Sequence, residues 1–123
     1  MKIAILICAL TIGIVPLVAS PRAEAKGEVS LGEKLQLGSV RIRPLSVVED
    51  SRCPIEVQCG GLNRIIVRTE IRGPESTKIR NFEIGQIREV EGAGGLMLAA
   101  VSPSPPADTT IASAAYRFTY QVR

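Results

Sequence analysis

The C-terminal segment Tyr116-Arg117-Phe118-Thr119-Tyr120-Gln121-Val122-Arg123 alternates strictly between apolar and polar side chains. A period of two places the three aromatic residues and the valine on one face of an extended chain. That face carries three of the four aromatic residues in the sequence. We therefore expect a half-buried β-strand here, at the centre of the fold.

Several other segments have the same period, and none sustains a helical one. In residues 63–72, Ile65, Val67 and Ile71 alternate with arginines and a glutamate, and Ile66 is the exception. Further strands are expected at Leu35 to Leu37, Val40 to Val48 with a bend or bulge at Pro44, Lys78 to Ile84, Gln86 to Val90, and Leu96 to Val101, the last buried on both faces because it is apolar throughout. Six to eight short strands predict an all-β fold, a small antiparallel sandwich or barrel, with Ser102 to Ser113 as a surface loop.

The N-terminal residues have the build of a secretory signal. A lysine at position 2 precedes an uncharged apolar run of 16 residues, Ile3 to Val18, and Ala23 and Ala25 stand where a signal peptidase reads small residues. An uncleaved membrane anchor is the alternative, but a bilayer-spanning helix needs about 20 residues. We expect residues 1–25 to be a signal peptide, residues 26–123 to form a single β-rich domain, and the mature protein to be periplasmic or secreted.

The mature part keeps one pair of cysteines, Cys53 and Cys59. In an oxidising compartment an even pair predicts a disulfide, and closing so short a loop stabilises a thin core by about 2.4 kcal/mol. A redox-active pair would need a closer spacing such as Cys-x-x-Cys.

The segment from Asp50 to Gly61 is the most distinctive in the chain. Asp50 can accept hydrogen bonds from the backbone amides that follow it and pair with Arg52, and Pro54 presets φ for a short turn that would contain Ile55 and Glu56. We interpret the segment as a compact knob between two strands, closed by the disulfide. Its residues Asp50, Ser51, Arg52, Pro54, Ile55 and Glu56 are the candidate interaction or structural site.

The run Asp50-Ser51-Arg52-Cys53-Pro54, followed five residues later by Cys59, resembles a signature of small exported bacterial proteins of uncharacterised function. Segments Leu98 to Pro103 and Ala115 to Tyr120 are similar to that family's C-terminal pattern, so the likeness covers roughly Val40 to Arg123. The chain departs from the family where Trp-Ala-Gly usually follows the second cysteine, because Gly60-Gly61-Leu62-Asn63 stands there instead. The resemblance implies export and a disulfide, and it implies no activity.

Composition argues against several kinds of chemistry. The chain has no histidine, which excludes Ser-His and Cys-His nucleophiles and imidazole metal sites. A Ser-Lys dyad using Lys26, Lys34 or Lys78 stays open, but no motif surrounds these lysines. Calcium binding by Glu49, Asp50 and Glu56 is less favoured than turn capping and an Asp50–Arg52 ion pair. We expect neither cofactor nor metal.

The net charge of +3 is too small to imply a nucleic-acid partner. Arg64, Arg68 and Arg72, with Arg41 and Arg43, could form a basic stripe for a polyanion, but a solvated strand face is the simpler reading because Glu70 interrupts it. The sequence favours a non-enzymatic envelope module that binds an unknown protein or glycan through the knob. A purely structural envelope protein, an inhibitor of an envelope or secreted protease, and a hydrolase using carboxylates or a Ser-Lys pair are the alternatives.

Overall fold

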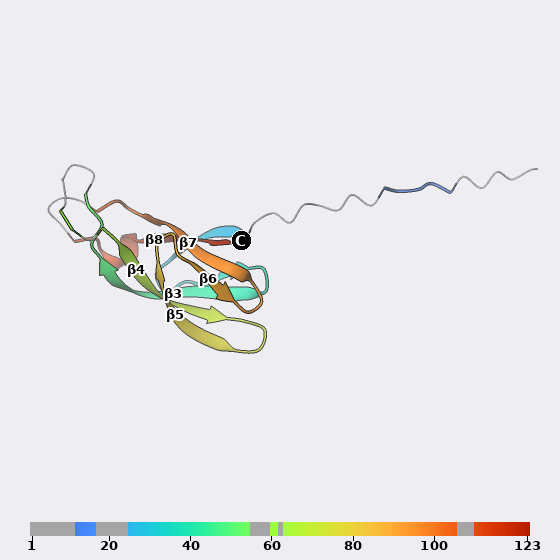
Figure 1. The fold of residues 1–123 in the computed structure, drawn as a ribbon, viewed down its shortest axis with the longest axis horizontal. Helices are drawn as coiled ribbons and strands as arrows, with labels where there is room; N and C mark the ends of the chain where they lie inside the picture. The colour runs from blue at the N-terminus through green and yellow to red at the C-terminus, as the bar shows by residue number, and fades with distance from the viewer. Residues whose placement is uncertain (1–11, 17–24, 55–59, 62, 106–109) are drawn as a thin grey trace, which may run out of the picture.

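The computed structural model describes residues 12–16, 25–54, 60–61, 63–105 and 110–123. Within these ranges the chain forms two antiparallel four-stranded sheets, ordered β1-β8-β7-β6 and β2-β3-β4-β5, with no α-helix (Figure 1). The strands are β1 (Lys26–Ser30), β2 (Leu35–Leu37), β3 (Val40–Asp50), β4 (Ile65–Arg72), β5 (Thr77–Glu83), β6 (Ile87–Val90), β7 (Gly94–Ser102) and β8 (Arg117–Val122), and a 3-10 turn, η1 (Ser113–Ala115), precedes β8. The predicted all-β class is confirmed, and of the two predicted architectures the described residues form two sheets rather than a closed barrel.

The core lies between the two sheets and is built by the alternation seen in the sequence. Phe118 and Tyr120 of β8 are fully buried, as are Ile65 and Val67 of β4. The Phe82 ring packs edge-on against Tyr120, with the ring centroids 6.2 Å apart, so the two sheets meet through aromatic contact. β8 lies between β1 and β7, which confirms its predicted central position.

Two buried hydroxyl groups are paired inside this core. The Thr69 Oγ1 and Tyr120 Oη atoms lie 2.7 Å apart, and both side chains are fully buried. A buried hydroxyl without a hydrogen-bond partner costs free energy, so this pair favours one position of the two sheets relative to each other.

The predicted irregularity in the long strand β3 is present. Its pairing with β4 shifts register between Pro44 and Ser46, where proline cannot donate to the ladder, and again between Val47 and Glu49. A turn at Gly38-Ser39 joins β2 to β3.

The prediction that Leu96 to Val101 is buried on both faces is wrong. Leu96 and Leu98 are buried, but Ala100 is exposed. The reason is that β7 belongs to a sheet that the other sheet covers on one face, so side chains on its outer face stay partly or fully exposed.

The strand β1 was not predicted from the sequence. It pairs with β8 through Lys26 to Ser30, although Val29 is its one buried residue. Ala25 packs against the core, and its carbonyl accepts a hydrogen bond of 2.8 Å from the Val122 N–H. β1 begins one residue after Ala25, the last residue of the predicted signal peptide, and Ala23 lies outside the described residues.

Residues 12–16 form no element and are exposed, and Figure 1 shows them well away from the domain. In the described part of the chain, no helix is both long and apolar enough to span a bilayer.

Candidate functional site

A buried ion pair stands where β3 ends. The Arg52 guanidinium donates to the Asp50 carboxylate through two bonds of 2.9 Å, Nε to Oδ1 and Nη2 to Oδ2. The two side chains are 12% and 13% exposed. Bidentate geometry of this kind is the strongest form of an arginine–carboxylate pair, and the Asp50–Arg52 interaction expected from the sequence is present.

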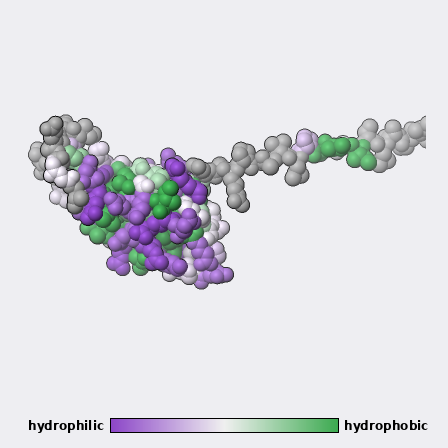
Figure 2. Space-filling model, viewed as in Figure 1, coloured by the Kyte–Doolittle hydropathy of each residue, from purple (hydrophilic) through white to green (hydrophobic). Residues whose placement is uncertain are grey.

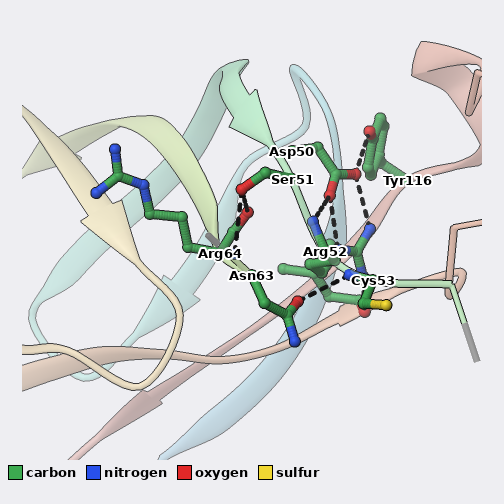
Figure 3. A network of polar contacts seen from close by, with 8 residues as sticks. Asp50, Ser51, Arg52, Cys53, Asn63, Arg64 and Tyr116 are labelled. Atoms are coloured by element: carbon green, nitrogen blue, oxygen red, sulfur yellow. Dashed lines mark hydrogen bonds and ion pairs between the residues drawn. The ribbon is translucent and has the colours of Figure 1, made fainter. Parts of the chain in front are cut away.

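The pair also reaches the other sheet. Arg52 Nη1 donates to the Val101 carbonyl of β7 at 3.0 Å, and Tyr116 Oη, just before β8, donates to Asp50 Oδ2 at 2.8 Å (Figure 3). We call this set, formed by Asp50, Arg52, Tyr116 and the Val101 carbonyl, the Asp50 network. It joins the end of β3 to both strands that flank the β7–β8 connection.

The network shifts the pKa values of Asp50 and Tyr116. Burial alone would raise the pKa of Asp50, but hydrogen bonds from Arg52 and Tyr116 outweigh it and hold that pKa below the ordinary 3.8. Burial, reinforced by the hydrogen bond to the Asp50 carboxylate, raises the pKa of Tyr116 to about 12. At neutral pH the carboxylate is therefore charged and the phenol neutral, as the hydrogen bonds require.

Ser51 extends the pairing of β3 with β4 by one residue. Its N–H donates to the Arg64 carbonyl at 2.8 Å, while its Oγ donates to the same carbonyl and accepts from the Arg64 N–H. Next to it, the Cys53 N–H donates to the Asn63 Oδ1 at 2.8 Å. The two stems of the β3–β4 connection are thus held together by side chains as well as by backbone.

Arg64 plays a separate part. Its guanidinium points away from the Asp50 network in Figure 3 and pairs with the Glu49 carboxylate. Glu49 and Asp50 are both engaged by arginines, which leaves them poorly suited to the calcium reading. In the described ranges no group of three or more potential metal ligands gathers.

The other predicted site residues fall into two groups. Cys53 and Pro54 belong to the described residues, and both are half-buried. The predicted bridge from Cys53 to Cys59, and the positions of Ile55 and Glu56, lie outside the described residues.

Tyr116 is the site residue that sequence reasoning placed in the core without a polar role. Its ring does stack on Phe118, with centroids 5.6 Å apart, yet its hydroxyl leaves the core to reach Asp50. A buried tyrosine hydroxyl needs a hydrogen-bond partner, and Tyr116 is the first residue of the alternating C-terminal segment. These two facts could have predicted a polar contact for its hydroxyl.

The five arginines considered as a basic stripe do not act together. Arg41, Arg43, Arg68 and Arg72 share the outer face of the β2–β5 sheet, where Glu70 pairs with Arg43 and Arg72, whereas Arg64 pairs with Glu49. This supports the reading of a solvated strand face. Hydrophilic residues cover much of the side shown in Figure 2, and apolar residues form separate patches.

Lys78, one of the three lysines considered for a Ser-Lys dyad, lines a groove but forms no such dyad within the described residues. Ser76 and Lys78 line the same groove, but no hydrogen bond joins their side chains in the described part of the chain.

No family model, no curated protein and no solved structure matches this chain. The resemblance to small exported bacterial proteins therefore stays a prediction.

Proposed function

We propose that the chain is an exported, non-enzymatic binding module whose binding surface is one end of the sandwich. We call it the loop end. It carries the β3–β4 and β7–β8 connections, whose described stems are joined by the hydrogen bond from Arg52 Nη1 to the Val101 carbonyl. The partner proposed is a protein or glycan of the cell envelope.

The observation that carries the proposal is the contact of the Arg52 guanidinium with two elements. It binds Asp50 of β3 and the Val101 carbonyl of β7, so one side chain fixes the stems of both connections. Loops held on a rigid scaffold are where binding residues usually gather, and preordered stems reduce the entropy lost on binding.

This geometry changes the role proposed for the knob residues. With 12% of its side chain exposed, Arg52 supports the surface rather than contacting a partner. Contacts come instead from exposed residues of the two connections, of which the described ones include Gly60, Asn63, Ser104 and Thr110.

A purely structural role is the second candidate, and the same observation favours it, because a clamp between two connections also closes one end of the core. The two candidates differ in whether the exposed residues at the loop end matter. The experiment uses the tagged, exported protein in its native host, with envelope proteins and glycans cross-linked before purification.

Ser104→Arg adds a bulky charge at the loop end, and Ser39→Arg adds the same charge at the exposed β2–β3 turn. We expect Ser104→Arg to abolish capture of a partner that the wild type and Ser39→Arg retain, with all three proteins equally stable. Equal capture by both variants, or no partner enriched over an unrelated exported β-domain, would leave the structural role.

A further inference from the structure

A groove of about 260 Å³ lies between β5 and β6, which are edge strands of the two sheets. The other two edge strands, β1 and β2, lie at the opposite side of the sandwich. We call it the edge groove. It lies toward the β4–β5 turn, whereas the Asp50 network lies at the Ile65 end of β4, so it is separate from the loop end. Gly73 and Glu91, from the β4–β5 and β6–β7 turns, line it at that end.

Three cations occupy core-facing positions in this groove. Lys78 and Arg80 lie on the same face of β5 as the buried Phe82, and Arg88 of β6 lies opposite the buried Leu96 of β7. A period of two therefore turns all three cationic side chains toward the space between the sheets. Lys78 and Arg80 are exposed because the opposite sheet leaves that space open.

The three cations have no carboxylate partner among the described residues. The ion pairs formed there use Arg43, Arg52, Arg64 and Arg72. Glu89 and Glu91 also line the groove but pair with none of its cations. Convergent unpaired cations inside a concave surface attract an anion more strongly than the same charges on a flat face.

Arg88 is the most constrained of the three. Its guanidinium carbon lies 6.0 Å from the centroid of the Phe82 ring, which holds the planar group by a cation–π contact. Its Nε is buried and has no hydrogen-bond partner among the described residues, which is also true of the Arg43 Nε on β3. Cations placed only to keep other strands off an open sheet edge can stay fully hydrated, whereas the Arg88 guanidinium is held against an aromatic ring and lines a groove.

We propose that the edge groove binds the oxyanion group, phosphate or carboxylate, of a small ligand. Arg88 donates to the oxyanion, Lys78 and Arg80 add charge, and Ile71 and Val90 contact the apolar part of the ligand. The groove is slightly smaller than the roughly 300–1,000 Å³ typical of pockets for drug-sized ligands, which limits the occupant to a small molecule or one unit of a larger one.

The test is a titration of the isotope-labelled protein followed by NMR. The probes are phenyl phosphate, benzoate and inorganic phosphate, with benzyl alcohol as the uncharged control. We expect phenyl phosphate or benzoate to shift the amide signals of β5 and β6. A stronger effect of the phosphate probe, or of the carboxylate probe, identifies which oxyanion the groove prefers.

Arg88→Gln should weaken binding of the better probe by about tenfold or more, the loss expected from one charge-assisted hydrogen bond. Arg68→Gln, an equal charge change on the outer face of β4, should leave it unchanged. If Arg88→Gln unfolds because Phe82 loses its cover, the double variant Lys78→Gln, Arg80→Gln carries the test, since both side chains are exposed. Absence of shifts in β5 and β6, tight binding of benzyl alcohol, or an equal loss in Arg68→Gln would overturn the proposal.

Discussion

Replacing Arg52 by alanine removes three side-chain hydrogen bonds at once. Two go to the Asp50 carboxylate and one to the Val101 carbonyl. What remains is a largely buried carboxylate with Tyr116 as its remaining side-chain donor among the described residues. The variant therefore measures how much of the fold depends on the Asp50 network.

The magnitude follows from the burial of the pair. Removing one partner of a fully buried ion pair costs about 3–5 kcal/mol. Because 12–13% of these side chains still contacts water, we expect the lower end, about 3 kcal/mol. For a domain of this size each kcal/mol shifts the melting temperature by about 4–8 °C, so Tm should fall by about 12–24 °C.

The assay is urea and thermal unfolding followed by far-ultraviolet circular dichroism. Arg68→Ala is the matched control, because Arg68 is an exposed arginine of β4 that makes no ion pair within the described residues. We expect the control to change the free energy of unfolding by less than about 0.5 kcal/mol. A loss below about 1 kcal/mol for Arg52→Ala, or equal losses for the two variants, would refute the reasoning.

Four further predictions follow, two on pH, one on the buried hydroxyl pair and one on a turn. A carboxyl group whose pKa is lowered by folding stabilises the fold above its unfolded pKa, so the stability difference between wild type and Asp50→Asn should shrink as pH falls below 3.8, and a difference constant down to pH 2 would contradict this. The pKa values of both tyrosines are raised above 10.0 in the fold, so the phenolate absorbance of the native protein should rise at higher pH than that of the urea-unfolded protein. Stability should fall between pH 10 and 12, because tyrosines ionise in the unfolded protein while they stay neutral in the fold; a tyrosine that titrates near 10.0 while the protein is folded would exclude it. Thr69→Val should cost about 1–3 kcal/mol because Tyr120 Oη loses its partner, and adding Tyr120→Phe should recover part of that loss, which an additive double variant would disprove. Gly92→Ala should destabilise more than Gly38→Ala in the same unfolding assay, because both glycines have positive φ but a Cβ at Gly92 would lie 2.8 Å from the Pro74 Cδ, and equal losses would count against that contact.

The sequence predicted most strands because each sheet has one covered face. The alternation in β8, and in β4 apart from Ile66, follows from that geometry, so the period of two identified both strands and their buried sides. β1 escaped notice because it buries a single valine and owes its conformation to pairing with β8, which a local pattern does not show. The order of the strands depends on such pairings between distant segments, and for the same reason it could not be read from the sequence.

The candidate site was predicted in part. The Asp50–Arg52 ion pair is local in sequence and was expected, and the structure contains it. The bonds to Val101 and Tyr116 span 49 and 66 positions along the chain, and they exist because β3, β7 and β8 meet at one end of the sandwich. Because of those contacts Arg52 is largely buried, so it supports the loop end and does not contact a partner itself. The sequence alone does not show that burial.

The central claim is that the Asp50 network holds the stems of both connections together at the loop end. Native-state hydrogen exchange of wild type and Arg52→Ala tests it most directly. We predict coordinated loss of protection at the Ser51 and Arg64 amides and in β7 and β8 near Val101 and Phe118, while β4 near Ile71 stays protected. Loss confined to one of the two connections, or protection unchanged in both, would contradict it.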